Sequence, residues 1–497
     1  MTQELEADPV LGRLADAVLI PPFPEGREPD WIRAALADGL AGVTLYGLNI
    51  EDNRQLAALT TRLREAATEP VIAIDEEGGD VTRISHQAGS DYPGNAALGA
   101  VDDVELTRSV YAALGADLAA LGINLDLAPA VDVNTAAGNP VIGTRSFGSD
   151  PDLVARHAAA AVAGLQSAGV AACAKHFPGH GSTIEDSHLV LATVDAPLSV
   201  LRARDLPPFE AAIAAGVRAI MPSHLRVPEL TGDLPASLSR RAQTDLLRGE
   251  LGFTGVIVSD GLEMRAVSEQ YGIPEAAVQA LIAGTDLLCL GRDQDRLGYL
   301  AVKTALLAAV RSGRLPGERL EEAAARVAEL RAWTAAAASD TAAGAAAADG
   351  LIGLTAARRA LSVSGTLPAA NRPLVVQLVP PSNLAAGTVP WGLGPYVPAD
   401  SYREISTGTR PLELADQVSA ALAAASGRML IIVVRDAHRH PVAVAAVEQI
   451  LAARPEAVVL EMGLPVWRPA GRSYLASYGA ARTSGRAAAE ILGLAAR

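Results

Sequence analysis

Cysteine and aromatic residues are scarce in this 497-residue chain. Only Cys173 and Cys289 are present, far apart and each inside an apolar run. That spacing excludes a disulfide framework and a cysteine-based metal site, so we expect two buried free thiols. Aromatic residues make up 4% of the chain, while alanine is abundant. This composition predicts helices that pack closely around small side chains.

Long hydrophobic runs and net positive charge are also missing. No apolar run reaches the roughly 18 residues that span a bilayer, so we expect no membrane partner. The acidic N-terminus has no basic segment followed by an apolar core, which predicts a cytoplasmic protein without a secretory signal. The net charge of −15 argues against a nucleic-acid partner, which requires basic patches. It does not exclude a local basic pocket for an anionic ligand.

Short apolar runs alternate with helical patterns along the first 290 residues. Eight such units predict an α/β fold of the (β/α)8 TIM-barrel type. An open doubly wound sheet is the rival, but no Gly-rich dinucleotide fingerprint follows the first run. The runs span residues 17–23, 42–46, 71–74, 124–128, 170–174, 219–221, 255–258 and 285–290.

The pattern changes after residue 335. The alanine-rich stretch 336–350 predicts a linker, although its alanines also suit an extension of the preceding helix. Beyond it, four apolar runs and three helical patterns predict a smaller parallel sheet flanked by helices. We therefore expect a catalytic barrel domain at 1–335, a linker at 336–350 and a C-terminal α/β sandwich domain at 351–497. The polar cluster at 435–440 in that domain favours a solvated loop over a chemical role.

One stretch, 168–188, concentrates polar side chains. It begins as an apolar run and then holds six ionisable residues within 175–188, interrupted by a proline and glycines. Burying unpaired polar groups costs several kcal/mol, so such crowding at a strand end indicates a ligand site. A solvated loop that happens to hold three histidines is the alternative.

Other polar residues follow several of the apolar runs, and in a barrel the carboxyl ends of the strands converge on one pocket. We assign Glu76, Glu77 and Asp132 to structural roles such as helix caps and rim ion pairs. The remaining candidates for the pocket are Asp75, Arg83, Arg145, Lys175, His176, Asp186, His188, Ser223, His224, Ser259 and Asp260.

These residue types suit glycoside cleavage with retention of configuration. Asp186 can hold the ring of His188, which then exchanges protons near neutral pH. A carboxylate, either Asp260 or Asp75, can act as the nucleophile. A metal site is the main rival, with ligands drawn from His176, His180, His188, His224 and Asp186. A serine hydrolase is disfavoured because no GxSxG motif is present.

KHFPGHGSTIEDSH at 175–188 resembles the signature of glycoside hydrolase family 3, in its β-N-acetylglucosaminidase subgroup. The pattern is K-H-F-P-G-H-G, four free residues and D-S-H, and every specified position is met. The resemblance continues in AIDEEGGDVTRI, NPVIGTRSFG, IMPSHLRVP, GFTGVIVSDGLEM and AGTDLLCL.

The resemblance implies a role for each matching residue. Asp260 would be the nucleophile, His188 the acid/base and Asp186 its partner. The residues that would hold the terminal N-acetylglucosamine are Asp75, Arg83, Arg145, Lys175 and His176. The subgroup is exo-acting, uses no metal or other cofactor, and often recycles peptidoglycan fragments. One departure is Gly261, since an acidic or bulky residue commonly follows the nucleophile.

Several functions stay open at this point. A neutral histidine does not repel an anion, so phosphate could replace water as the acceptor, giving a phosphorylase. A β-glucosidase or β-xylosidase of the same family is an alternative, although such relatives usually lack the D-S-H loop. A non-catalytic sugar-binding protein is a third. The natural aglycone (a muropeptide, a chitooligosaccharide or a glycoconjugate) and the oligomeric state are not encoded in any motif.

Overall fold

The structure, a computed structural model, describes residues 8–344, 351–368, 372–381, 387–408 and 410–496. These residues divide into two units. The first contains the described parts of 1–76, 107–141 and 149–349, and the second those of 77–106, 142–148 and 350–497. Two segments from the first half of the chain thus belong with the C-terminal residues, a grouping that differs from the predicted domain ranges.

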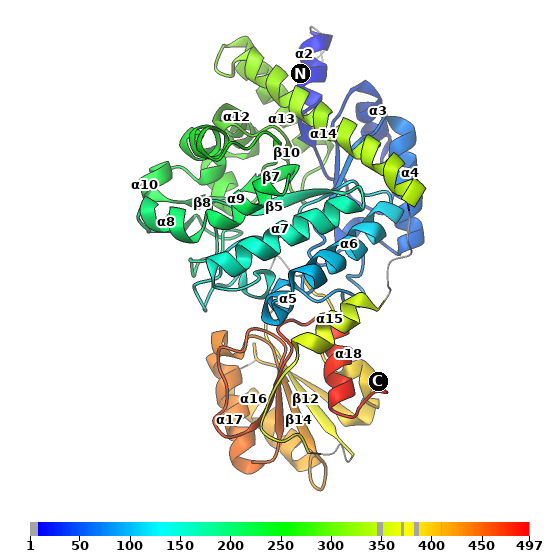
Figure 1. The fold of residues 1–497 in the computed structure, drawn as a ribbon, viewed down its shortest axis with the longest axis vertical. Helices are drawn as coiled ribbons and strands as arrows, with labels where there is room; N and C mark the ends of the chain where they lie inside the picture. The colour runs from blue at the N-terminus through cyan, green and yellow to red at the C-terminus, as the bar shows by residue number, and fades with distance from the viewer. Residues whose placement is uncertain (1–7, 345–350, 369–371, 382–386, 409, 497) are drawn as a thin grey trace. The chain divides into compact units, whose positions relative to one another are not determined.

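Parallel strands close into a barrel in the first unit (Figure 1). One ladder runs in the order β2–β3–β4–β5–β7–β9, and β1 pairs with β10. A bridge between Val258 and Leu287 connects β9 to β10, and Thr44 N donates to Pro21 O (3.3 Å) beside β1. The strands are β1 (Leu19–Ile20), β2 (Gly42–Leu45), β3 (Val71–Ile74), β4 (Leu125–Asp126), β5 (Ala171–Phe177), β7 (Ala219–Pro222), β9 (Val256–Ile257) and β10 (Leu288–Cys289).

Each predicted apolar run overlaps one of these strands, so the predicted (β/α)8 barrel is confirmed. One boundary was wrong: β5 continues to Phe177, so that Lys175 and His176 lie within the strand rather than after it. The extension is held by pairing with β7 and by a parallel bridge between Ala130 and Lys175. A short parallel pair of β6 (Ala192–Thr193) and β8 (Leu225–Arg226) was not predicted.

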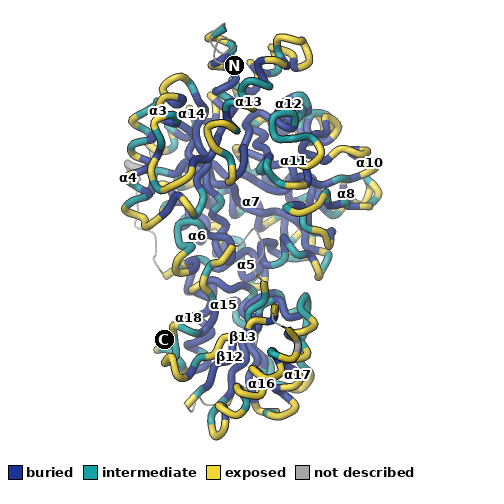
Figure 2. Tube along the Cα trace, turned by 180° about the vertical axis from the view of Figure 1, so that it is seen from behind, coloured by how far each residue is buried: buried dark blue, intermediate teal, exposed yellow. Residues whose placement is uncertain are grey.

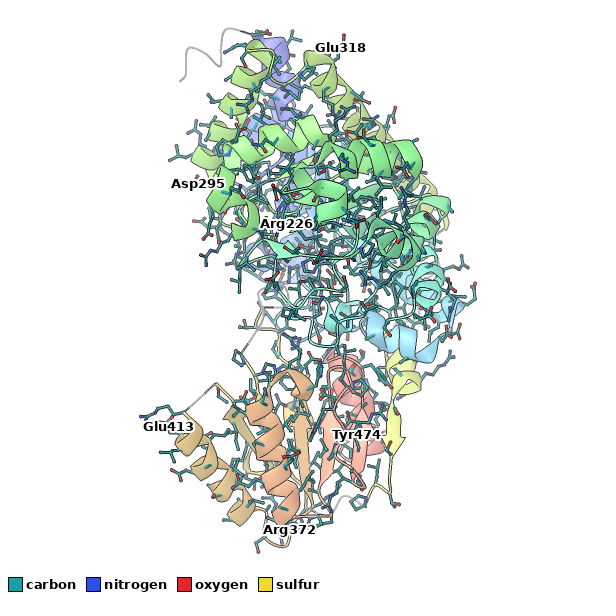
Figure 3. The ribbon with its side chains drawn as sticks, turned by 90° about the vertical axis from the view of Figure 1, so that its left-hand side faces the viewer. Arg226, Asp295, Glu318, Arg372, Glu413 and Tyr474 are labelled. Carbon is teal, nitrogen blue, oxygen red and sulfur yellow. The ribbon has the colours of Figure 1, made fainter. Side chains whose placement is uncertain are left out.

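Aspartate caps begin several of the barrel helices, because a carboxylate accepts hydrogen bonds from the exposed N–H groups of the first turn. Asp52 caps α4, Asp150 caps α7, and Asp295, labelled in Figure 3, caps α13. The helices of the first unit are α2 (Pro9–Asp16), α3 (Asp30–Asp38), α4 (Asn53–Ala66), α6 (Val104–Ala120), α7 (Pro151–Ser167), α8 (Leu198–Arg204), α9 (Pro207–Ala214), α10 (Pro228–Thr231), a π-helix (Arg241–Glu250), α11 (Arg265–Tyr271), α12 (Ile273–Ala283), α13 (Arg296–Arg311) and α14 (Gly317–Gly344).

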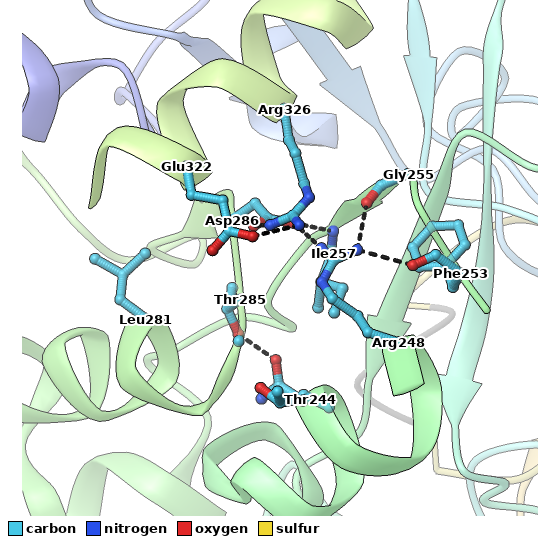
Figure 4. Close-up of polar contacts among 12 residues, drawn as sticks. Thr244, Arg248, Phe253, Gly255, Ile257, Leu281, Thr285, Asp286, Glu322 and Arg326 are labelled. Carbon is cyan, nitrogen blue, oxygen red and sulfur yellow. Dashed lines mark hydrogen bonds and ion pairs between the residues drawn. The ribbon is translucent and has the colours of Figure 1, made fainter. Parts of the chain in front are cut away.

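A buried carboxylate, Asp286, ties the segment before β10 to its surroundings (Figure 4). It accepts a hydrogen bond from Ile257 N (2.9 Å) and forms ion pairs with Arg248, Arg319 (2.7 Å) and Arg326 (3.3 Å). Arg319 and Arg326 both come from α14. The last barrel helix is therefore fixed to the strands by charge as well as by apolar packing.

The barrel core consists of small and branched side chains from all eight strands and their flanks, to which Val327 and Leu330 of α14 are added. The strands lie in the buried interior, while the exposed faces belong to the helices and loops (Figure 2). Cys173 and Cys289 are buried free thiols, as predicted.

The helix α14 runs through 336–344 of the predicted linker, and 345–350 lies outside the described residues. No helix in the described part of the chain combines the length and apolarity needed to cross a membrane.

The second unit contains a sheet with the order β11–β16–β15–β14–β12–β13, in which only the β11–β16 pair is antiparallel. Core side chains of α16 and α17 pack on one face of it and those of α18 on the other, which confirms the α/β sandwich. The elements are α5 (Asn95–Val101), α15 (Ile352–Ala360), β11 (Ser362–Ser364), β12 (Leu374–Val379), β13 (Tyr402–Ser406), α16 (Pro411–Ala424), β14 (Leu430–Val434), α17 (Pro441–Ala453), β15 (Val458–Glu461), β16 (Ser473–Ala476) and α18 (Arg482–Ile491).

Candidate active site

The polar stretch begins inside β5 and continues into a tightly packed turn. The Lys175–His176 and Phe177–Pro178 peptide bonds are cis. Gly181 lies so close to the neighbouring loop that a Cβ atom on it would fall 2.0 Å from Val133 O. Glycine is therefore required at this position, and the turn is packed directly against the segment that follows β4.

Asp132 holds this turn together. Its carboxylate accepts hydrogen bonds from the backbone N–H groups of His176 (3.2 Å) and His180 (2.7 Å), and from His176 Nδ1 (2.8 Å). Burial would raise the pKa of Asp132, but the nearby histidines and these hydrogen bonds lower it below its usual value. The charged carboxylate thereby places the proton of the His176 ring on Nδ1.

His188 and Asp186 form the predicted dyad. His188 Nδ1 lies 2.8 Å from Asp186 Oδ1, which also accepts a hydrogen bond from His188 N (2.9 Å). Burial opposes ionisation of Asp186, but the hydrogen bonds from the ring and backbone of His188 lower its pKa below the usual value. The ionised carboxylate fixes the Nδ1–H tautomer and leaves Nε2 as the nitrogen that exchanges protons. Ser187, between them, has its Oγ 2.9 Å from His180 Nε2.

Asp260 follows β9 and lies in the electrostatic field of three histidines. Burial would raise its pKa, but His224, His176 and His188, together with a hydrogen bond from Gly261 N (2.8 Å), lower it. Asp260 is therefore a carboxylate at neutral pH. A Cβ atom on Gly261 would make only ordinary contacts, so the backbone does not require glycine at this departure from the family pattern.

His224 supports the segment next to Asp260. Its Nε2 donates to Gly261 O (3.1 Å), and its Nδ1 lies 2.6 Å from Ser237 Oγ. Burial lowers the pKa of His224, as do His188 and His176, against the opposing effect of Asp260. The carbonyl oxygen of Gly261 places a proton on Nε2, and Nδ1 meets the serine hydroxyl.

Lys175 and Asp75 come together across the barrel although they are far apart in the sequence. Lys175 Nζ on β5 lies 2.6 Å from Asp75 Oδ1, just after β3. The lysine is nearly buried, whereas about a fifth of the Asp75 side chain is exposed (21%). The pair presents a carboxylate and an ammonium, which suits hydrogen bonding to neighbouring hydroxyl groups of a ligand.

The two predicted arginines lie in the second unit. Arg145 forms a two-point ion pair with Glu77, with distances of 2.7 and 2.8 Å, and its carbonyl accepts from Asn95 Nδ2 (2.7 Å). Arg83 lies in the segment after β3, where its carbonyl oxygen is 2.8 Å from His86 Nδ1. The structural role assigned to Glu77 from the sequence, an ion pair, is confirmed.

Three residues support the site through contacts that the sequence did not predict. Asp132 follows a strand like the other candidates, but nothing in the sequence shows which backbone groups it accepts from. His224 was predicted as a pocket residue, and both His180 and His224 were considered as metal ligands. Their rings contact Ser187 and Gly261, which adjoin His188 and Asp260 in the sequence. No cluster of three or more His, Cys, Asp or Glu side chains among the described residues is arranged to hold a metal ion.

Known proteins resemble this chain in sequence and in fold. Residues 24–330 match the model of the glycosyl hydrolase family 3 N terminal domain. A beta-hexosaminidase of Stenotrophomonas maltophilia (strain K279a) is 39% identical over 269 residues, which cover 53% of this chain and 78% of that protein.

Two solved structures extend the likeness. A glycoside hydrolase family 3 beta-N-acetylglucosaminidase from Paenibacillus sp. str. FPU-7 has a TM-score of 0.86 and 32% identity, covering 98% of this chain and 97% of that one. A beta-N-acetylhexosaminidase from Beutenbergia cavernae DSM 12333 has a TM-score of 0.60 and 30% identity, covering 66% of this chain and 100% of that one. The likeness to the Paenibacillus enzyme thus includes both units.

Proposed function

Because this chain belongs to glycosyl hydrolase family 3, we propose that it is a retaining exo-β-N-acetylglucosaminidase that removes terminal N-acetylglucosamine from cell-wall fragments or chitooligosaccharides. The names of the similar beta-hexosaminidase and beta-N-acetylglucosaminidase support this substrate class. The observation that carries the proposal is the Asp186–His188 hydrogen bond, with His188 close enough to Asp260 to lower the pKa of that carboxylate.

In the first step, Asp260 attacks the anomeric carbon of the sugar, and the bond to the leaving oxygen breaks. His188, protonated on both nitrogens, gives its Nε2 proton to that oxygen, while Asp186 stabilises the imidazolium through Nδ1–H. The products are a covalent glycosyl-aspartate ester and the released aglycone, now carrying a hydroxyl group.

In the second step, neutral His188 takes a proton from water at Nε2, and the water oxygen attacks the anomeric carbon. The ester bond breaks and Asp260 leaves as a carboxylate. Two displacements on opposite faces return the sugar in its original β configuration. We propose water as the acceptor; inorganic phosphate at the same position would give a sugar 1-phosphate.

Substrate binding is proposed for Asp75, Lys175 and His176, whose side chains are held by the ion pair with one another or by Asp132. They would accept from and donate to the hydroxyl groups of the terminal sugar. For Arg83 and Arg145, the sugar-binding role stays a prediction from the family resemblance. Asp132, His180 and His224 would position the reacting groups without touching the sugar.

A substrate panel tests the function. The chain is incubated with 4-nitrophenyl β-N-acetylglucosaminide, β-glucoside and β-xyloside, each with and without phosphate. Proton NMR identifies the anomer of the sugar that is released first. We expect cleavage of the N-acetylglucosaminide alone and release of the β anomer first. Preferred cleavage of the glucoside or xyloside would overturn the substrate class, and sugar 1-phosphate as the main product would replace water with phosphate as the acceptor.

A further inference from the structure

A cavity of about 380 Å³ opens at the carboxyl ends of the strands in the C-terminal sheet. It is lined by the end of β12 and the two prolines after it, by residues 387–391, by Glu404 of β13, and by Arg435, Asp436, Arg439 and His440 after β14. Every lining residue belongs to the second unit. The sequence pattern favoured a solvated loop at 435–440, and the structure instead makes this loop one wall of a pocket.

The position of the cavity in the sheet is the first argument for a binding site. In chain order, β13 is added on one side of β12, while β14, β15 and β16 follow on the other. The chain therefore reverses direction across the sheet between β12 and β14. In open parallel sheets, the crevice outside the strand ends at this reversal is where ligands bind.

The charge of the pocket is the second argument. Arg435, Arg439 and His440 line it, and the 13-residue helix α17 begins directly after His440, adding the partial positive charge of its N-terminus. Glu404 and Asp436 are the acids of the lining. Glu404 accepts a hydrogen bond from Tyr402 Oη (2.6 Å), and Asp436 accepts one from Leu464 N (2.9 Å).

The two arginines are placed differently. Arg435 is anchored, since it pairs with Asp80 (3.1 Å) and lies 5.9 Å from the centre of the Trp391 ring. Arg439 reaches its nearest carboxylate, on Asp436, only at 3.9 Å, which is too long for a hydrogen bond. Burial lowers the pKa of His440, and so do Arg439, His438 and Arg435, against the effect of Asp436.

Gln377 supplies an independent third observation. Its side chain is 1% exposed and lines the cavity, and its Oε1 has no hydrogen-bond partner among the described residues. An unpaired buried acceptor is costly unless a ligand donates to it, as a hydroxyl group can. Trp391, on the same wall, offers a flat apolar surface of the kind that ligand pockets combine with a few polar groups.

The loop that carries the cations is rigidly held. The buried carboxyl group of Glu461, at the end of β15, accepts from the backbone N–H groups of Asp436 (2.7 Å), Ala437 (3.1 Å) and Gly463 (2.7 Å). The arginines are therefore preorganised, which reduces the entropy lost when a ligand is bound.

We propose that this cavity binds an anionic sugar, a monosaccharide carrying a phosphate or carboxylate group. Arg439 and Arg435 would bind the anionic group, Gln377 would accept from a hydroxyl group, and Trp391 would contact the ring. The site does not depend on the proposed hydrolase activity, because binding is measured directly.

The test is calorimetric titration of the full chain with N-acetylglucosamine 6-phosphate and with N-acetylmuramate. Neutral N-acetylglucosamine and inorganic phosphate are titrated alongside. We expect at least one anionic sugar to bind and to change the tryptophan fluorescence, with that change lost in Trp391→Phe. Arg439→Gln should weaken binding at least about 10-fold, or about 1.4 kcal/mol. The phosphate and carboxylate probes show which anion the site takes.

Arg468→Gln is the matched control. Arg468 lies over the Tyr474 ring (5.5 Å) in the same unit, outside the cavity, so its loss should leave binding unchanged. Equal affinity in wild type, Arg439→Gln and Arg435→Gln would overturn the proposal. A Trp391-dependent fluorescence change with neutral N-acetylglucosamine would also overturn it. Inorganic phosphate that binds as tightly as the sugar phosphate would contradict the proposal that the ligand is a sugar. If Arg435→Gln unfolds because its contact with Asp80 is lost, the affinity of Arg439→Gln alone tests the proposal.

Discussion

Asp260 is the residue whose replacement we expect to reduce activity most. Burial opposes its charge, but His224, His176, His188 and Gly261 N keep its pKa low, so that the carboxylate is ready to attack. Asp260→Asn keeps the shape and removes the nucleophile. We expect kcat to fall at least about 1,000-fold, or about 4 kcal/mol of barrier, as measured by steady-state hydrolysis of an aryl N-acetylglucosaminide.

The control for this variant is Asp233→Asn, an exposed aspartate of the first unit whose nearest partner is Arg226 at 3.6 Å. Its kcat should stay within about twofold of wild type, because exposed ion pairs contribute little. Asp260→Asn with more than about a tenth of the wild-type kcat would remove Asp260 from the nucleophile role.

His188 is tested by the choice of leaving group. A poor leaving group needs the Nε2 proton, whereas an activated aryl oxide leaves without it. His188→Ala should therefore reduce kcat/KM by about 100-fold or more on N-acetylglucosamine disaccharides and much less on the 2,4-dinitrophenyl glycoside. The comparison is made from steady-state rates on both substrates. Equal losses would mean that His188 is not the general acid.

How far the sequence predicted these residues depends on how local their contacts are. The Asp186–His188 dyad spans two residues, so its spacing alone indicates that ring and carboxylate can meet. Lys175 and Asp75 are far apart in the sequence, and only the barrel topology brought them together in the prediction. Asp132 was assigned a structural role, but its partners were not predicted, because they are backbone N–H groups whose positions depend on the exact path of the turn.

At the scale of elements, the loops after β14 and β15 depend on the protonation of Glu461. Burial, and to a smaller extent Asp436, raises the pKa of Glu461 to about 8, from an ordinary value of 4.5. Between these values the folded chain holds a proton that the unfolded chain has lost. The stability of the second unit should therefore fall as the pH rises from about 4.5 to about 8, with each unit of pKa difference contributing about 1.4 kcal/mol.

Glu461→Gln should flatten this part of the pH dependence, because the titrating group is gone. The measurement is the unfolding temperature at several pH values between 5 and 8 (about half-unit steps). Glu448→Gln, an exposed position on α17, is the matched control and should keep the wild-type slope. An unchanged slope in Glu461→Gln would contradict the raised pKa.

Elements with a strong apolar pattern were predicted, and those without one were not. The four central strands of the second sheet are apolar runs buried on both faces, and all four were expected. The edge strand β13 was missed because only Ile405 among its residues is buried, so its sequence lacks an apolar pattern. β11 is three residues long and likewise gives no pattern.

At the scale of the whole molecule, the segment 77–106 was assigned to the barrel domain because it follows a barrel strand. Its helix α5 instead packs against α15, and Arg359 of α15 pairs with Asp103 (2.8 Å). Sequence order could not predict this grouping, because the apolar face of α5 suits either set of neighbours. The close approach of α15 to this segment is what places the segment in the second unit.

That approach can be tested with two helical glycines. A Cβ atom on Gly353 of α15 would fall 2.0 Å from the backbone oxygen of Asp91, whereas one on Gly12 of α2 would meet nothing within 4 Å. Gly12→Ala should stabilise the chain by about 0.5–1 kcal/mol through helix propensity. Gly353→Ala should destabilise it by about 1–3 kcal/mol, because backbone must move to relieve the overlap. Thermal unfolding measures the stability of both variants, and limited proteolysis measures how readily each variant is cut between residues 77 and 106. If the two variants shift the unfolding temperature in the same direction, α15 does not fix this segment to the second unit.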